Sequence, residues 1–427
     1  MLDIIYDATL ITNYFHKDSA RSGIFFVAYN ILLELQKRKD VRLTLYIDPE
    51  RSGEAVRVKK MLFPNLEYVF DYSRNKILVA INLWLWENHS RLFSHFWLRK
   101  TFALGIVFTQ SLLKLMMRNN YNVGVLNSAD VYLSPAFKIP ELIRSKTDAK
   151  AYILLHDTIP FKFPEFNNLH WGDYLRAIFN TSQKGDYFFA NSECSKKDFE
   201  EIFPLVTNLS CKVTPLAASE SFRPIVDERV KVYVGLKYKI PQNKRYVFSL
   251  CTVEPRKNLI RAVRCFIAFV EKHNIEDLIW VMGGGHWDSF IKELKKNDVS
   301  WDPKYIIRAG YIDDEDLPAL YSNAEWFVYT SRYEGFGLPP LEAMQCGCPV
   351  ITSNNSSLPE VVGDAGIMID WDSDEQHVEA YEKYYFNEKI RKENSQKGVE
   401  RAKLFSWEKT VDGMIEMMKK YYNGDSK

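Results

Sequence analysis

The sequence has few cysteines, no long apolar run and no excess of either charge. Its six cysteines form no Cys-x-x-Cys pair and no zinc-ligand spacing, so we expect reduced thiols in a cytosolic protein. Fifty-six basic residues against 55 acidic ones leave a net charge of +1, which argues against a nucleic-acid-binding protein. Low-complexity tracts are missing, and this excludes a largely disordered, collagen-like or coiled-coil chain. The first seven residues have the pattern of a strand rather than of a secretory signal.

Short apolar runs instead alternate with helical patterns along the 427 residues, which is typical of parallel α/β construction. The expected strands are 2–6, 42–47, 131–133, 151–155, 187–190, 212–215, 246–251, 278–282, 305–308, 326–329, 349–352 and 366–369. We therefore predict two doubly wound, Rossmann-like domains that face each other across a cleft. The predicted parts are residues 1–217, a linker at 218–243, a second domain at 244–405 and a C-terminal helix at 406–427 that can cross back to the first domain.

Residues 76–118 interrupt this alternation with a segment that is rich in tryptophan, phenylalanine and basic side chains. Six basic residues against the single acid Glu87 give it a charge of +5; they are Lys76, Arg91, Arg99, Lys100, Lys114 and Arg118. Its longest apolar run, Phe102 to Phe108, is far too short to cross a bilayer. The segment fits either helices that lie on an anionic membrane surface or amphipathic helices packed on a sheet.

A carboxylate-flanked glycine loop is the strongest candidate for chemistry. The run Glu334-Gly-Phe-Gly-Leu-Pro-Pro-Leu-Glu342-Ala-Met follows the strand expected at 326–329 and opens a helix. Gly335 and Gly337 allow close backbone approach, and the exposed amides of the helix start can bind a diphosphate. Because carboxylates do not bind phosphate, we expect Glu334 on the loop to face a sugar and Glu342, in the first helical turn, a ribose diol. The alternative is a junction whose acids only interact with the helix dipole.

Two further groups follow predicted strands and therefore face the same cleft. Arg256 and Lys257 come after the first strand of the second domain, where adjacent cations can neutralise a diphosphate leaving group. His156, followed by Asp157, comes at the end of the strand 151–155. The alternatives are a solvated basic turn and a buried core histidine.

Glu334 and Glu342, with seven residues between them, resemble the signature of retaining glycosyltransferases of the GT-B fold, family 4. Three other runs match the pattern of that family: 254–258 (Glu-Pro-Arg-Lys-Asn), 347–353 (Gly-Cys-Pro-Val-Ile-Thr-Ser) and 357–361 (Ser-Leu-Pro-Glu-Val). The resemblance is dense between residues 245 and 370 and looser in the first domain. One departure is Cys251, at a position where the family commonly has glycine.

The resemblance implies an acceptor-binding first domain and a second domain that binds a nucleotide sugar. It implies that Glu334, His156, Arg256 and Lys257 are the catalytic group, with His156 against the transferred sugar and the two cations in place of a metal ion. Donor-binding positions would be Gly23, Gly283, Tyr311, Ile312, Gly335, Phe336, Gly337, Leu338 and Glu342. Arg21, Asp157 and Ser192 would lie on the acceptor side, although the run that begins at Asn191 also fits a plain helix cap.

We expect no metal cofactor. The run Asp372-Ser373-Asp374 looks like a metal-binding Asp-x-Asp, but its position before a helical pattern predicts an N-cap with first-turn acids. Neither a Walker A run nor a His-Glu-x-x-His motif is present, so an NTPase and a zinc hydrolase lack support.

The sequence thus favours a retaining, metal-independent hexosyltransferase. The expected donor is GDP-mannose, with a UDP-hexose as the alternative, and the expected acceptor is a growing, lipid-linked glycan of a surface polysaccharide such as a lipopolysaccharide O-antigen. Such an enzyme would be cytoplasmic and peripheral on the inner face of the cell membrane. Two other hypotheses remain: a non-catalytic protein that binds a nucleotide sugar, and a GT-B epimerase that acts on a UDP sugar.

Overall fold

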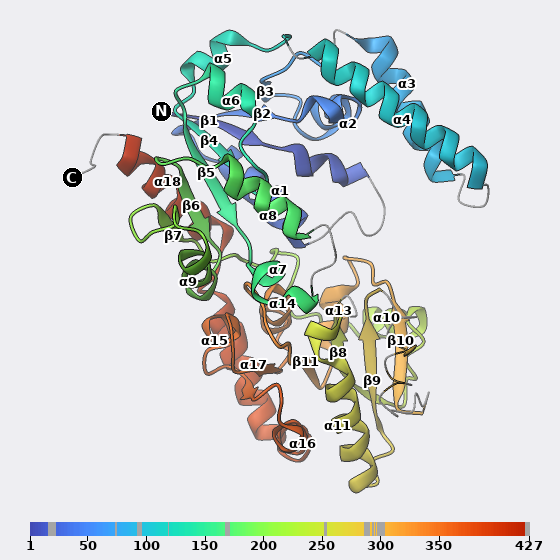
Figure 1. Ribbon diagram of the computed structural model, residues 1–427. Helices are drawn as coiled ribbons and strands as arrows, with labels where there is room; N and C mark the ends of the chain where they lie inside the picture. Colours follow the sequence, from blue (N-terminus) through green and yellow to red (C-terminus); the bar gives the residue numbers. More distant parts are fainter. Residues whose placement is uncertain are drawn as a thin grey trace.

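Two parallel β-sheets, one in each half of the chain, form the framework (Figure 1). The computed structural model describes residues 1–15, 23–72, 75–91, 96–117, 119–166, 171–251, 254–285, 291, 292, 294, 296 and 304–422. The first sheet has the order β3-β2-β1-β4-β5-β6-β7 and the second the order β10-β9-β8-β11-β12-β13. The prediction of two doubly wound α/β domains is confirmed.

The strands lie close to the ranges expected from the sequence. They are β1 (Leu2–Asp7), β2 (Val41–Tyr46), β3 (Glu67–Tyr68), β4 (Val131–Ser134), β5 (Lys150–Leu155), β6 (Tyr187–Ala190), β7 (Cys211–Val213), β8 (Arg245–Leu250), β9 (Leu278–Gly283), β10 (Ile306–Gly310), β11 (Trp326–Tyr329), β12 (Val350–Ser353) and β13 (Ile367–Ile369). Strands such as β4, β11 and β12 are buried along their whole length, because helices cover both faces of each sheet.

The helices surround the sheets as their apolar spacing predicts. They are α1 (Gly23–Gln36), α2 (Ser52–Arg57), α3 (Lys76–Arg91), α4 (Phe96–Met117), α5 (Val123–Ser128), α6 (Glu141–Lys146), α7 (Ile159–Lys162), α8 (Trp171–Thr181), α9 (Glu193–Ile202), α10 (Glu228–Lys237), α11 (Leu259–Lys272), α13 (Leu317–Ser322), α14 (Leu338–Gln345), α15 (Leu358–Val362), α16 (Asp374–Phe386), α17 (Glu388–Ala402) and α18 (Trp407–Tyr422). Helix α11 is representative: its Phe266 is fully buried and meets Trp280 of β9 edge to face, with ring centroids 5.2 Å apart.

Strand order reverses at one point in each sheet, between β1 and β4 and between β8 and β11. Loops that follow adjacent strands on either side of such a point diverge and leave a crevice at the carboxyl edge. Candidate residues of the second domain lie after β8 and β11 and at the ends of β9 and β10, and those of the first domain lie after β1, β5 and β6. The topology therefore brings the predicted residues to facing edges.

The segment expected to link the domains contains a helix. Helix α10 packs on the second domain, where Lys237 Nζ lies 2.7 Å from Asp313 Oδ2 and Tyr238 donates to Asp316 Oδ2 at 2.7 Å. Much of residues 218–243 is therefore part of the second domain rather than free connecting chain.

The C-terminal helix α18 crosses back to the first domain, where Figure 1 shows it in red beside β6 and β7. The Tyr421 ring stacks on Tyr187 of β6 with centroids 4.3 Å apart, and Thr410 donates to the carbonyl of Pro215 at 2.6 Å. Arg38, just beyond α1, pairs with Asp412 at 2.9 Å. These contacts tie the end of the chain to the domain that its first residues build.

Residues 76–91 and 96–117 form two helices, α3 and α4, that lie side by side at the edge of the first domain (Figure 1). A buried hydrogen bond from Asn82 Nδ2 to Thr109 Oγ1 (2.7 Å) joins them. Among the helices that the structure describes, we find none whose length and hydropathy would let it cross a bilayer.

Candidate functional site

Three charged side chains from two loops meet at the switch point of the second sheet. The Glu334 carboxylate, which is 7% exposed, lies 2.8 Å from Arg256 Nη1 and 2.6 Å from Lys257 Nζ. Burial by itself raises the pKa of Glu334, but the attraction of both cations outweighs it and lowers the pKa to about 2. The three side chains are therefore an ionised carboxylate and two cations, and Glu254 lies 3.4 Å from Arg256 Nη2 as a second carboxylate beside them.

Local structure holds these three groups in place. Arg256 and Lys257 lie on the short 3-10 turn Pro255–Lys257 that follows β8, while Glu334 follows β11, the next strand in the sheet. Arg256 also donates to the carbonyl of Tyr333 at 2.7 Å, and Lys257 to the hydroxyl of Tyr329 at 2.6 Å. Both cations are thus oriented before any ligand arrives, which is the arrangement that stabilises developing negative charge.

Gly335 lies at one of the contacts between the two domains. A Cβ atom at this position would lie 2.6 Å from the carbonyl oxygen of His156 and 2.8 Å from Cβ of Asp157, so only glycine fits. The hydroxyls of Ser192 and Ser195 donate to the Gly335 carbonyl at 2.7 and 2.9 Å. The domain contact therefore excludes a side chain at the residue next to Glu334.

His156 is buried beside this contact and is 5% exposed. Burial lowers its pKa to about 4, so the ring is neutral at pH 7. Its Nε2 lies 2.7 Å from the carbonyl of Pro135, which can only accept, so Nε2 carries the proton and Nδ1 is an acceptor. Burial raises the pKa of the adjacent Asp157, while the positive charge of Arg256 lowers it.

Two helix starts converge across the domain boundary. Gly337, with φ 119°, is the N-cap of α14, and Gly23 is the first residue of α1. A Cβ atom on Gly23 would lie 4.0 Å from Leu338 Cδ1, so the two helix N-termini are close neighbours. Each start carries the positive end of a helix dipole, which favours an anion between them, although Pro339 and Pro340 in the first turn of α14 have no N–H to donate.

Glu342 is the fifth residue of α14, in its second turn rather than in the first as expected. It accepts a hydrogen bond from the buried hydroxyl of Tyr321 at 3.1 Å. Burial raises its pKa to about 7, although the bond from Tyr321 opposes the shift. A buried carboxyl group with a raised pKa, such as that of Glu342, is a candidate for ligand binding.

We expect Glu342→Gln to stabilise the folded protein at high pH. Because the folded-state pKa is raised above the unfolded value, the wild type binds the extra proton when folded and loses stability as the pH rises from about 4.5 through about 7. At pH 8 the variant should melt roughly 2–4 °C higher, and at pH 4 the two should melt together. Differential scanning calorimetry across this range tests it; equal melting temperatures at pH 8 would contradict the raised pKa.

The remaining predicted positions are distributed around this centre. Ile312 and Phe336 are buried, and a Cβ on Gly283 would lie 2.9 Å from Ile312 Cγ1, so Gly283 makes room for that side chain. Tyr311 is 58% exposed. Arg21 lies outside the described residues, so its predicted place on the acceptor side stays a prediction.

For two segments, the sequence also predicted a helix cap instead of a ligand site. Ser192 is the N-cap of α9 and accepts from the amide of Ser195 at 3.0 Å, in addition to its bond across the domains. Ser373 caps α16, and Asp374 pairs with Arg261 at 2.8 Å, so the predicted capping role of 372–374 is confirmed. Within the described ranges, no group of three His, Cys, Asp or Glu side chains could hold a metal ion.

Tyr333 connects the domains beside Glu334, and sequence reasoning missed it. Its hydroxyl donates to Asp198 and lies 3.2 Å from Lys162 Nζ, while its ring packs on Phe163 at 4.9 Å. All of these partners belong to the first domain. An aromatic residue directly before the acidic loop was the available signal, but its partners lie 135 or more residues away in the sequence.

Glu360 forms a second connection, and sequence reasoning assigned it no role. Its carboxylate accepts from the amides of Glu193 and Cys194, both at 2.8 Å, at the start of α9. A carboxylate of the second domain thus caps a helix of the first.

We expect Glu360→Ala to loosen the closed arrangement of the domains without removing any group that faces the central cluster. Loss of the two bonds should cost about 1–2 kcal/mol, so hydrogen exchange at the start of α9 should become about tenfold faster. Exchange mass spectrometry measures this, with Glu400→Ala on α17 as the control. Unchanged exchange around Cys194 would mean that Glu360 does not hold the domains together.

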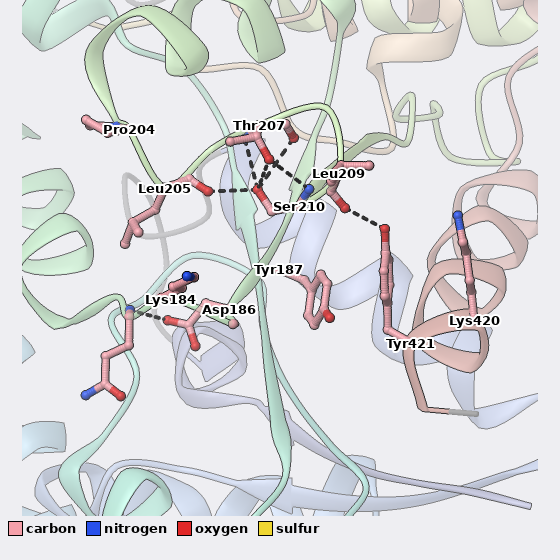
Figure 2. Close-up of a pocket in the computed structure, with 12 residues that line it drawn as sticks. Lys184, Asp186, Tyr187, Pro204, Leu205, Thr207, Leu209, Ser210, Lys420 and Tyr421 are labelled. Carbon is pink, nitrogen blue, oxygen red and sulfur yellow. Dashed lines mark hydrogen bonds between the residues drawn. The ribbon is translucent and has the colours of Figure 1, made fainter. Parts of the chain in front are cut away.

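A cavity of about 610 Å³ lies at the opposite edge of the first sheet (Figure 2). It is bordered by the loops before β6 and β7 and by Tyr421 of α18, whose hydroxyl donates to the carbonyl of Leu209 at 2.6 Å. It lies at the amino ends of the strands, away from the charged cluster and from every predicted site residue. This cavity is therefore not the candidate site.

Comparisons with known proteins agree with this geometry. The family model of glycosyl transferases group 1 matches residues 236–401. The chain is 30% identical over 301 residues to O-antigen chain mannosyltransferase B of Escherichia coli, covering 68% of this chain and 74% of that protein. It is 27% identical to the serotype-specific mannosyltransferase WbdA of Escherichia coli, covering 62% of this chain but only 33% of that longer protein.

Two solved structures share the fold along nearly the whole chain. Sucrose-phosphate synthase from Thermosynechococcus elongatus aligns with a TM-score of 0.66 and 14% identity over 99% of this chain and 100% of that one. WaaG, a glycosyltransferase involved in lipopolysaccharide biosynthesis, aligns with a TM-score of 0.60 and 14% identity over 98% and 99% of the two chains. The GT-B architecture predicted from the sequence is thereby confirmed.

Proposed function

Because the chain belongs to the glycosyl transferases of group 1, we propose that it is a retaining mannosyltransferase that uses GDP-mannose to extend a surface polysaccharide such as an O-antigen. The observation that carries this proposal is the cluster of Glu334, Arg256 and Lys257 beside two converging helix starts. Mannose as the transferred sugar is supported by the names of the relatives, which are mannosyltransferases.

The diphosphate of the donor binds where positive charge is concentrated. Arg256 and Lys257 are preoriented by Tyr333 and Tyr329, and α14, which begins four residues after Glu334, starts beside the start of α1, so that both helix dipoles add positive potential there. When the diphosphate binds, it competes with Glu334 for the two cations. Glu334 can then accept hydrogen bonds from hydroxyl groups of the sugar while the cations stabilise the departing phosphate.

Retention of configuration follows from attack on the face that the diphosphate leaves. The bond between the anomeric carbon and the phosphate oxygen breaks, the acceptor oxygen bonds to the same carbon, and the acceptor proton moves to the departing phosphate oxygen. This route needs no nucleophilic carboxylate. Glu334 is then engaged with hydroxyl groups of the sugar, and the two cations with the departing phosphate.

His156 and Glu342 have supporting roles in this proposal. The neutral His156 ring lies at the domain contact, where it can hydrogen-bond a hydroxyl of the transferred sugar. Glu342 accepts from the ribose diol of the nucleotide, in addition to the hydrogen bond that it receives from Tyr321. The acceptor glycan, which we propose to be lipid-linked, enters from the first domain on the cytoplasmic side of the membrane.

A thermal-shift screen of GDP, UDP and ADP, with and without EDTA, tests the donor proposal. A nucleotide that binds only the folded state raises the melting temperature, by about 2.7 kcal/mol of stabilisation at 100 times its Kd. We expect the largest shift with GDP and the same shift in EDTA, because two cations take the place of a metal. A larger shift with UDP would overturn GDP-mannose, and loss of the shift in EDTA would overturn metal independence. Release of GDP from GDP-mannose would then separate an enzyme from a protein that only binds the nucleotide sugar.

A further inference from the structure

Helix α4 exposes a line of large apolar side chains. Trp97, Leu104, Phe108 and Leu115 are 75%, 65%, 64% and 66% exposed. They are separated by 7, 4 and 7 residues, so at 3.6 residues per turn they lie along one side of the helix. Helices of soluble domains normally place such a line against a core.

Helix α3 repeats the pattern with Ile77, Ile81 and Trp84, which are 80%, 45% and 54% exposed and are spaced four and three residues apart. The Trp84 ring contacts Phe102 of α4, with centroids 5.5 Å apart. The two exposed lines therefore belong to one helical pair. We call these seven side chains of α3 and α4 the apolar face.

The apolar face is not the side of α3 and α4 that packs on the first domain. Residues on the other sides of α3 and α4 are buried: Val79, Asn82, Ile106, Thr109, Leu113 and Met117. Packing on the protein is thus already satisfied by a separate set of residues. Core packing, one of the two alternatives left open by the sequence, accounts for the buried set but not for the apolar face.

Basic side chains accompany the apolar face. The two helices contain Lys76, Arg99, Lys100 and Lys114 against Glu87, which is paired with Arg57 of α2; Lys114 in turn pairs with Glu50. Lys100 Nζ lies 5.9 Å from the centre of the Trp97 ring, so the cation and the indole occupy the same level of the helix. Exposed tryptophans with neighbouring lysine and arginine are suited to the headgroup region of an anionic bilayer.

We propose that the apolar face of α3 and α4 docks on an anionic lipid bilayer, with both helices lying in the plane of the surface. The apolar side chains enter the boundary between headgroups and acyl chains, while the cations meet the phosphate groups. This deepens the proposed function, since a lipid-linked acceptor would be met at the surface on which the first domain rests. The positive charge of the pair disfavours a second copy of the chain as occupant, because equal charges would be brought together.

Vesicle flotation of the full-length protein tests the proposal. The test variant is Leu104→Ser with Phe108→Ser and Leu115→Ser, all on the exposed line of α4. The control is Val226→Ser with Leu236→Ser and Leu404→Ser, which removes apolar side chains that are 91%, 67% and 57% exposed elsewhere. Because all six positions are exposed, both variants should melt within a few degrees of the wild type, which thermal denaturation checks.

We expect the wild type and the control to float with vesicles of phosphatidylcholine and phosphatidylglycerol at 3:1, and less as salt is raised. The test variant should float about tenfold less. Equal flotation of the test variant and the wild type would overturn the proposal, and so would a wild type that stays at the bottom of the gradient. A wild type that is dimeric without lipid, together with a monomeric test variant, would identify the apolar face as a contact between copies and overturn lipid docking.

A GDP thermal shift on the same three proteins separates this inference from the proposed function. An unchanged shift with lost flotation supports lipid docking and leaves the nucleotide site intact. If none of the proteins responds to nucleotide, the proposed function fails, while the flotation result still decides the docking surface.

Discussion

Glu334→Gln is expected to lower the rate of mannosyl transfer by about 100-fold or more while binding of GDP is kept. The substitution keeps the shape of the side chain but removes a charge that is present across the physiological pH range, since the pKa of Glu334 is about 2. A glutamine amide can still touch a sugar hydroxyl but cannot balance Arg256 and Lys257. In the free variant Lys257 loses its carboxylate partner and Arg256 keeps only Glu254, at 3.4 Å, so GDP should bind at least as tightly as it does to the wild type.

Release of GDP from GDP-mannose measures the rate, and calorimetric titration measures binding of GDP. The matched control is Glu325→Gln, whose carboxylate also pairs with arginine, at 3.1 Å from Arg391, but lies before β11 at the opposite edge of the sheet. Transfer at the wild-type rate in Glu334→Gln would rule out the proposed role. Weaker binding of GDP in this variant would mean that Glu334 contacts the nucleotide instead.

The double variant Arg256→Ala with Lys257→Ala should weaken GDP binding by about 100-fold or more and leave guanosine binding unchanged. Each cation should contribute about 1.5–3 kcal/mol through charge-assisted hydrogen bonds to the diphosphate. Guanosine has no phosphate and therefore gains nothing from either side chain. The difference between the two ligands isolates the electrostatic contribution from any general effect on the fold.

A suitable control is Arg261→Ala with Arg264→Ala. These two arginines lie only a few residues further along, on α11, but they pair with Asp374 at the start of α16. Equal losses for GDP and guanosine in the Arg256 and Lys257 variant would point to a distorted loop and would remove the diphosphate assignment. Since the variant leaves the buried Glu334 carboxylate without its two cationic partners, its melting temperature should be measured alongside.

The contacts between the domains were beyond the reach of sequence reasoning. Ser192 has the local pattern of a helix cap, and the structure confirms the cap, but the same hydroxyl also bonds to Gly335, 143 residues away. Glu360 and the start of α9 are separated by 166 or 167 residues. Nothing local in either segment indicates its partner, because the pairing depends on how two independently built sheets are placed against each other.

For the helical segment 76–118, too, the sequence could not show which residues contact the rest of the protein. Its composition is compatible with a core helix and with an interfacial one, since both need apolar residues at helical spacing. The choice depends on which side of each helix meets the protein. Only the structure separates buried Leu113 from exposed Leu115, two residues apart on the same helix.

The amino-acid sequence was sufficient to predict the parallel α/β architecture and to single out the central charged residues. Both follow from short-range order: apolar strands that alternate with amphipathic helices, and glycines and charges placed directly after strands. Tertiary structure decided that Glu334 lies between Arg256 and Lys257, that Glu342 is held by Tyr321, and that α1 and α14 begin side by side. The physical reason is that the strength of a charge interaction depends on distance and burial, and both arise only when residues far apart in the chain are brought together.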